Sequence, residues 1–205
     1  MNKGVLIIGL GSQSKYIIEI FRLNGVKIIG LIALPFETYA QEEVYGVRVL
    51  GSLNDFKNIY LENNSPYLML ACSKNKIKEE LVKDLSSYFP DYANAVHPSA
   101  VIATTARLGK GVIVNPNAVI QPYVSIGDHV MIHAGVIVEH DCVISDFVNL
   151  APRVALTGYV RVGKGSTIYT GAVVSPGLTI GEYSRVSAGS VVMSSIGDNI
   201  TFKGH

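Results

Sequence analysis

The sequence contains no tryptophan, only two cysteines and almost no net charge. Its 205 residues include 17 lysines and arginines against 16 aspartates and glutamates, a formal net charge of +1. Proteins that bind nucleic acid or anionic lipid through their charge carry a basic surplus, and this chain has none. Cys72 and Cys142 are too few and too far apart for the disulfide framework of a small secreted protein. We therefore expect no nucleic-acid partner and a reduced, cytoplasmic protein.

Long apolar runs are also missing. No stretch approaches the roughly 18 to 20 consecutive apolar residues that cross a bilayer, so no membrane partner is expected. The first residues, "MNKGVLIIGLGSQ", lack the pattern of a signal peptide, because one lysine is followed directly by a strand-like stretch that contains glycines. This pattern agrees with a cytoplasmic location.

Two different sequence patterns divide the chain near residue 95. In the first part, short aliphatic runs alternate with helix-like stretches. The aliphatic runs are 4–10, 26–34 and 67–73, and the helix-like stretches are 14–25, 53–63 and 76–89. Strands that alternate with helices are typical of a parallel sheet with crossover helices. We therefore predict a small Rossmann-like α/β domain over residues 1–95, whose first strand runs into the turn "GLGSQS".

From residue 96 onward, aliphatic residues recur at every sixth position. The series is Ile102, Leu108, Val114, Ile120, Ile126, Ile132, Val138, Ile144, Leu150, Leu156, Val162, Ile168, Val174, Ile180, Val186 and Val192. If each position were aliphatic with a chance of roughly one in three, an unbroken series of this length would be far beyond accident. The residue four positions after each member is small or medium-sized in nearly every case. This pattern predicts hexapeptide repeats, each with a short strand, a turn and an inward-pointing aliphatic side chain.

Glycine recurs on a longer period. Gly109, Gly127, Gly163 and Gly181 lie eighteen or thirty-six residues apart, and Ser145 occupies the remaining position. A period of eighteen means three hexapeptides per coil, and we expect the glycines where the backbone turns tightly. Residues 96–205 are therefore predicted to form an all-β domain, a parallel β-helix of a little over five coils.

Polar residues gather at Glu139, His140 and Asp141. Residues eighteen apart stack on neighbouring coils about 4.8 Å apart, so His140 should lie beside Gly158. His140 follows the inward-pointing Val138 by two residues, which places it on the outer surface. An imidazole base beside a free backbone N–H suits acyl transfer, because the base takes a proton while the N–H stabilises an oxyanion. Asp141 could raise the basicity of the imidazole if the chain bends there or if the contact comes from a partner subunit. A surface histidine without a catalytic role remains the alternative.

Three stretches of the sequence carry a resemblance to a known family. "NAVHPSAVI", "VIVEHDCVISDF" and "GAVVSPGLTIGEYSRVSAGSVV" resemble the bacterial sugar O-acyltransferases of the sialic-acid O-acetyltransferase type. Within that group the chain is most similar to the acetyl-CoA-dependent N-acetyltransferases that modify nucleotide-linked 4-amino-4-deoxy sugars, and the similarity covers nearly the whole chain. It implies left-handed coils, a homotrimer, acetyl-CoA as co-substrate without a metal, and a role in surface-polysaccharide biosynthesis.

The resemblance also implies roles for single residues. His140 matches the general base, Asp141 the acidic residue that tunes it, and Gly158 the glycine whose amide supports the tetrahedral intermediate. The positions matched to coenzyme binding are Asn149, Thr170 and Ala188. The positions assigned to the nucleotide-linked sugar are Gly11, Ser12 and Gln13 in the first turn, and Ser73. Apart from the resemblance, His133 is expected to line the acceptor pocket near His140, with a surface position that has no role as the alternative. Ala33 and Leu34 stand where the family usually has an acidic pair that contacts the nucleotide base.

Other functions stay open at this level. The acceptor could be a hydroxyl of a sialic acid or of another sugar. A zinc enzyme of the carbonic-anhydrase type would need His129, His133 and His140 to converge within about 2.1 Å of one point. His133 and His140 are seven residues apart and should lie on consecutive faces, so no metal is expected. A non-catalytic binding protein that has kept the fold is a third class.

Overall fold

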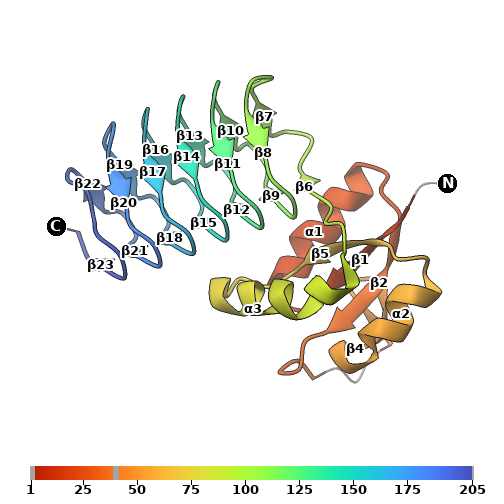
Figure 1. Cartoon of the computed structure of the whole chain (residues 1–205). Coiled ribbons are helices and arrows are strands. Elements are labelled where there is room, and N and C mark those ends of the chain that lie inside the picture. Colours follow the sequence, from red (N-terminus) through yellow and green to blue (C-terminus); the bar gives the residue numbers. More distant parts are fainter. Residues whose placement is uncertain (1–2, 39–41, 205) are drawn as a thin grey trace. The chain divides into compact units, whose positions relative to one another are not determined.

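The computed structural model of the chain describes residues 3–38 and 42–204. The chain divides into two compact units, Met1–Ala95 and Val96–His205 (Figure 1). None of the helices in the described ranges has the length and apolarity that a membrane span requires.

The N-terminal unit contains a five-stranded sheet in the order β3-β4-β2-β1-β5. Its elements are β1 (Val5–Ile8), α1 (Ser12–Leu23), β2 (Ile28–Ala33), β3 (Glu43–Val44), β4 (Val47–Ser52), η1 (Leu53–Asp55), α2 (Phe56–Glu62), β5 (Tyr67–Leu70), α3 (Asn75–Leu85) and η2 (Ser86–Tyr88). Strands β4, β2, β1 and β5 are parallel, and β3 pairs with β4 as an antiparallel hairpin. The predicted α/β unit is confirmed, but the sequence pattern missed β3 and β4.

Strand β1 occupies the middle of this sheet. All four of its residues are buried, because β2 and β5 flank it and helices cover the sheet. The ends of β1, β2 and β5 at Ile8, Ala33 and Leu70 meet at one edge, since these strands are parallel. In open α/β sheets the edge at the carboxyl ends of the strands is where ligands bind.

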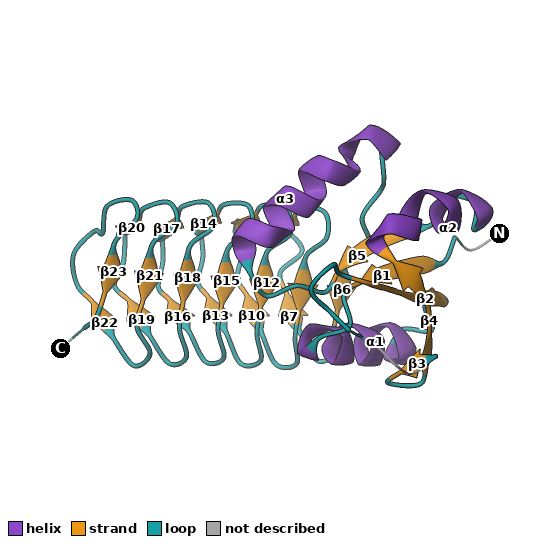
Figure 2. Ribbon diagram, turned by 90° about the horizontal axis from the view of Figure 1, so that it is seen from below, coloured by secondary structure: helices purple, strands orange, loops and turns teal. Residues whose placement is uncertain are grey.

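The C-terminal unit is a left-handed parallel β-helix of two-residue strands that form three faces (Figures 1 and 2). Face 1 contains β7 (Val101–Ile102), β10 (Val119–Ile120), β13 (Ile137–Val138), β16 (Ala155–Leu156), β19 (Val173–Val174) and β22 (Val191–Val192). Face 2 contains β8 (Arg107–Leu108), β11 (Ser125–Ile126), β14 (Val143–Ile144), β17 (Arg161–Val162) and β20 (Thr179–Ile180). Face 3 contains β6 (Ala95–Val96), β9 (Ile113–Val114), β12 (Met131–Ile132), β15 (Asn149–Leu150), β18 (Thr167–Ile168), β21 (Arg185–Val186) and β23 (Thr201–Phe202).

The aliphatic series predicted from the sequence forms the interior of the β-helix. Each member is the second residue of a strand, and the register between coils is eighteen residues, as for Ile120 with Val138. From Val114 onward every member of the series is buried. The predicted fold is therefore confirmed, because a period of six places one side chain per strand inside the prism.

The recurring glycines are explained by close approach between coils. A Cβ atom on Gly109 would lie 2.7 Å from the carbonyl carbon of Gly127, and one on Gly127 would lie 2.7 Å from the backbone nitrogen of Asp146. The left-handed backbone of this turn falls two residues later, at Gly111 with φ of 67° and Phe147 with φ of 59°. The glycines lie in the turns, as expected. They are required because neighbouring coils pack closely there, and not because their own backbone is left-handed.

Candidate active site

His140 and Asp141 lie in the turn between β13 and β14, at the corner where face 1 meets face 2. The Nδ1 atom of His140 is 2.9 Å from Oδ2 of Asp141, and the two side chains are 50% and 38% exposed. Neighbouring residues in an extended strand point in opposite directions. Asp141 instead has a left-handed φ of 59°, and this bend brings the two side chains together.

Gly158 lies on the next coil, directly beside the imidazole. A Cβ atom at Gly158 would lie 2.7 Å from Cε1 and 2.8 Å from Nε2 of His140, so only glycine leaves room for the ring in this position. The ring of Tyr159 meets the imidazole edge-on, with 5.1 Å between the ring centroids. Among the turn and loop hydrogen bonds of the described residues, none uses the N–H of Gly158.

This arrangement sets the tautomer of the histidine. An ionised carboxylate can only accept a hydrogen bond, so the proton of the neutral imidazole sits on Nδ1 and faces Asp141. The Nε2 atom then carries the lone pair and can act as a base. The Nε2 atom of His140 can therefore take up a proton close to the backbone of Gly158.

The three histidines considered for zinc lie at three different corners of the β-helix. His129, in the turn before β12, is buried and stacks on Phe147 with 5.3 Å between ring centroids. His133 follows β12, and His140 follows β13. Within the described ranges of this chain, no group of three or more histidine, cysteine, aspartate or glutamate side chains is placed to hold a metal ion.

The positions matched to coenzyme binding do not share the corner of His140 within one chain. Thr170 and Ala188 are exposed and stack at the corner between face 3 and face 1, where Gly189 N–H donates to the carbonyl oxygen of Thr170 at 2.9 Å. His133 lies at this same corner. Asn149 is half-buried on β15, and its Oδ1 atom has no hydrogen-bond partner among the described residues.

The four N-terminal positions assigned to the nucleotide-linked sugar lie together. Gly11, Ser12, Gln13 and Ser73 line one cavity of about 120 Å³. Gly11 precedes α1, whose first turn has no acidic residue and no side-chain cap, so its N–H groups favour an anion. Gln13 is 9% exposed, and its buried Oε1 atom has no hydrogen-bond partner among the described residues.

Glu37 belongs to the same cavity and was missed at the sequence level. Its carboxylate accepts hydrogen bonds from Leu10 N–H at 2.9 and 2.8 Å and from Leu34 N–H at 2.9 Å. An acidic group thus stands at the ends of β1 and β2, although Ala33 and Leu34 replace the expected acidic pair. The sequence feature that could have identified Glu37 is an acidic residue three positions after Leu34. Because Glu37 occupies the Leu10 N–H, that amide is not open to a diphosphate.

Neither cysteine is suited to covalent catalysis. Cys142 is buried, its thiol donates to the carbonyl oxygen of Thr157 at 3.1 Å, and burial raises its pKa to about 11. Burial also raises the pKa of Cys72. The thiolate is the nucleophilic form, so both residues are poor nucleophiles near neutral pH. Direct transfer without an acyl-enzyme agrees with this.

Comparison with known proteins finds solved structures that are similar to the chain. No protein-family model and no curated protein matches it, but solved structures do. Perosamine N-acetyltransferase from Caulobacter crescentus, crystallised as a histidine-to-asparagine variant with CoA and GDP-perosamine, is 34% identical with a TM-score of 0.90; the match covers 97% of this chain and 92% of that one. The acetyltransferase domain of PglB from Neisseria gonorrhoeae, in complex with acetyl coenzyme A, is 27% identical with a TM-score of 0.89; the match covers 98% of this chain and 96% of that one.

The fold and these matches define the class of protein as a hexapeptide-repeat acyltransferase. The chain belongs to the family of hexapeptide-repeat sugar acetyltransferases that includes perosamine N-acetyltransferase. The resemblance predicted from the sequence is confirmed.

Proposed function

We propose that the protein transfers the acetyl group of acetyl-CoA to the amine of a nucleotide-linked 4-amino-4-deoxy sugar. The observation that carries this proposal is the contact of His140 with Asp141 at 2.9 Å, with Gly158 directly beside the imidazole. The related Caulobacter enzyme binds CoA and GDP-perosamine, which supports both substrates. Acetyl-CoA and nucleotide sugars are made in the cytoplasm, so we infer a cytoplasmic protein that serves surface-polysaccharide biosynthesis.

The reaction proceeds by direct transfer. The amine nitrogen attacks the thioester carbonyl carbon, and Nε2 of His140 takes the proton that the nitrogen loses. Asp141 stabilises the imidazolium that forms, and the N–H of Gly158 donates to the developing oxyanion. The carbon–sulfur bond then breaks, the CoA thiolate leaves, and the proton on His140 passes to it. The products are the N-acetylated sugar and free CoA.

We also propose a homotrimer, supported by an apolar stripe on face 1. The outward residues of this face are Val101, Val119, Ile137, Ala155, Val173 and Val191, and Val101, Ile137, Val173 and Val191 are 36% to 61% exposed. His140 lies along one edge of face 1, and Thr170 and Ala188 lie along the other. In a ring around a three-fold axis, each edge meets the opposite edge of the next copy. The base of one subunit would then face the coenzyme positions of its neighbour.

The substitution Ile137→Glu tests the trimer. A charge in the centre of the stripe would be desolvated on assembly, so we expect dissociation to monomers and at least about a tenfold loss of activity. Light scattering after size-exclusion chromatography measures the mass. Thr179→Glu places the same charge on face 2 and should leave the assembly intact. A fully active monomer, or an undisturbed Ile137→Glu trimer, would contradict the proposal.

The activity itself is tested by a mass-spectrometric screen. The protein is incubated with acetyl-CoA and GDP-, UDP- or dTDP-linked 4-amino sugars, alongside CMP-sialic acid and free sialic acid. We expect one acetyl group on an amino sugar, with release of CoA. Thermal unfolding measured in parallel should show stabilisation by acetyl-CoA. Acetylation of sialic acid alone would indicate an O-acetyltransferase instead. Stabilisation by zinc alone would indicate a metalloenzyme, and no response to any of these compounds would indicate a binding protein.

A further inference from the structure

Tyr159 contacts the imidazole of His140 but has no part in the reaction described above. Its ring meets the imidazole edge-on, with 5.1 Å between the ring centroids and 88° between the ring planes. In the described part of the chain, this ring contact and the hydrogen bond to Asp141 are the side-chain interactions of the imidazole. The position of Nε2 therefore depends on Tyr159 as well as on Asp141.

The backbone of the β-helix fixes where this ring lies. Tyr159 directly follows Gly158, and it occupies the turn position of Asp141 on the next coil, eighteen residues later. Its N–H donates to the carbonyl oxygen of His140 at 3.1 Å, and its φ is 64°, so the left-handed turn at Tyr159 is bonded to the backbone of the histidine itself. The ring is therefore attached to a backbone that cannot move away from His140 without breaking the ladder between the two coils.

The hydrogen bond to Asp141 does not hold the imidazole by itself. A histidine side chain can occupy several staggered rotamers about its χ1 bond. His140 is 50% exposed and Asp141 is 38% exposed, so water competes for the bond between these two neighbours. Gly158 leaves space for the ring but has no side chain to hold it. A further contact is needed to favour the rotamer in which Nε2 lies beside Gly158.

We propose that Tyr159 is a positioning residue that holds the imidazole of His140 in the rotamer that accepts the proton. An edge-to-face pair of rings changes a rotamer population by about 2- to 10-fold. Only molecules with Nε2 beside Gly158 are ready for transfer, so the rate follows that population. The inference rests on the proposed acetyl transfer with His140 as the general base. Tyr159 acts through the histidine and not through a contact with either substrate.

Steady-state kinetics of Tyr159→Ala and Tyr159→Phe test this assignment. Removal of the ring should lower kcat about 2- to 10-fold and leave the KM for acetyl-CoA and for the amino sugar unchanged, because no substrate contact is lost. Tyr159→Phe should have the kcat of the wild type, because it keeps the ring. A higher KM for either substrate with an unchanged kcat would show that the ring binds that substrate, and the inference would be wrong.

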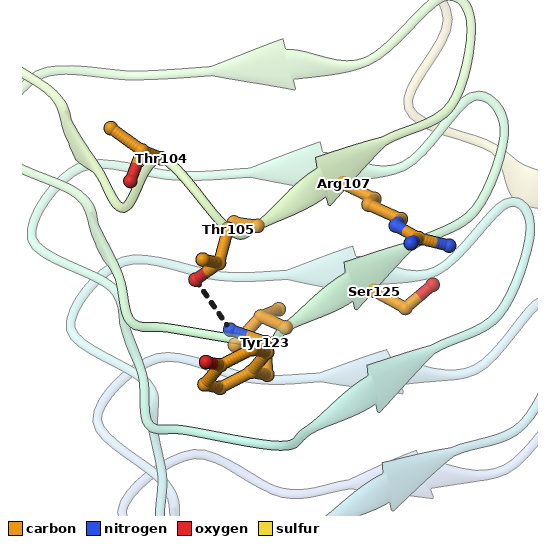
Figure 3. A pocket seen from close by; sticks show the side chains of 7 residues that line it. Thr104, Thr105, Arg107, Tyr123 and Ser125 are labelled. Atoms are coloured by element: carbon orange, nitrogen blue, oxygen red, sulfur yellow. Dashed lines mark hydrogen bonds between the residues drawn. The ribbon is translucent and has the colours of Figure 1, made fainter.

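Tyr123→Ala is the matched control. Tyr123 occupies the same turn position two coils earlier, with a φ of 63°, and it is 68% exposed against 59% for Tyr159. Figure 3 shows Tyr123 at the wall of a pocket, where its N–H donates to Oγ1 of Thr105 at 3.1 Å. The residue that corresponds to His140 beside it is Thr104, so kcat should stay near wild type. An equal loss of kcat in Tyr123→Ala and Tyr159→Ala would show a general effect of this corner and would overturn the inference.

A spectroscopic measurement tests the contact without reference to activity. The ring current of Tyr159, whose centroid is 5.1 Å from that of the imidazole, shifts the Hδ2 and Hε1 resonances of His140. These resonances are assigned by their loss in His140→Ala. They should move in Tyr159→Ala and stay in place in Tyr159→Phe, and unmoved resonances in Tyr159→Ala would exclude the contact.

The double variant of His140→Ala with Tyr159→Ala tests whether the ring acts through the imidazole. It should be no slower than His140→Ala alone, because the ring then has no base to position. A further loss of activity in the double variant would overturn the inference while the proposed function stands. If the wild-type protein acetylates no nucleotide-linked amino sugar, the proposed function fails and the role of Tyr159 falls with it.

Discussion

Replacing His140 with alanine is expected to lower kcat by about 10² to 10⁴-fold while the protein stays folded. The loss follows from removal of the general base. The fold should survive because the side chain is half-exposed and its hydrogen bond to Asp141 joins two neighbouring residues at the surface. Continuous measurement of CoA release gives kcat, and thermal unfolding reports the fold.

His97→Ala provides the matched control. His97 is a half-buried histidine of the same β-helix unit, with its Nδ1 atom 2.8 Å from the hydroxyl of Ser99. It lies outside the proposed site, so kcat should stay near wild type. Full activity of His140→Ala would show that another group takes the proton, and the direct-transfer mechanism would have to be abandoned.

Gly158→Ala is the second change with a large expected effect, a loss of about 10²-fold in kcat. The new methyl group would overlap the Cε1 and Nε2 atoms of His140, which lie 2.7 and 2.8 Å from its position. The imidazole is the end of a flexible, half-exposed side chain, so it should move away and the backbone should stay. Misplacing a base by about 1 Å is enough for a loss of this size.

The control for this change is Gly197→Ala. A Cβ atom at Gly197 would meet no atom within 4 Å, so activity and stability should remain near wild type. The double variant His140→Ala with Gly158→Ala tests whether the loss of activity in Gly158→Ala is caused by displacement of the imidazole. If the methyl group acts through the imidazole, the double variant should be no slower than His140→Ala alone. A further full loss in the double variant would show that Gly158 acts independently of the histidine.

Much of the C-terminal unit could be predicted because its constraint is local. Every sixth side chain must fill the prism, and no distant residue alters that requirement. The same regularity placed His140 beside Gly158, since eighteen residues return the chain to the same corner. The pair formed by His140 and Asp141 could not be derived this way, because it depends on a left-handed backbone at a non-glycine residue.

The N-terminal unit shows where sequence patterns are weaker. Strand β3 was missed because two residues give too short a signal to recognise, and β4 was missed because Arg48 and Gly51 interrupt its aliphatic run. The role of Glu37 was missed for a related reason: its partners Leu10 and Leu34 are joined only when β1 and β2 pair. No regular spacing connects a loop carboxylate to backbone amides on two strands.

The sequence by itself determined the β-helix, its register and the proximity of His140 to Gly158, because a repeat of fixed length converts position in the chain directly into position in space. Only the tertiary structure decided that Asp141 turns toward the imidazole and that Glu37 accepts hydrogen bonds from Leu10 N–H in the first turn and from Leu34 N–H. Those relations depend on backbone bends and on contacts between segments with no common period.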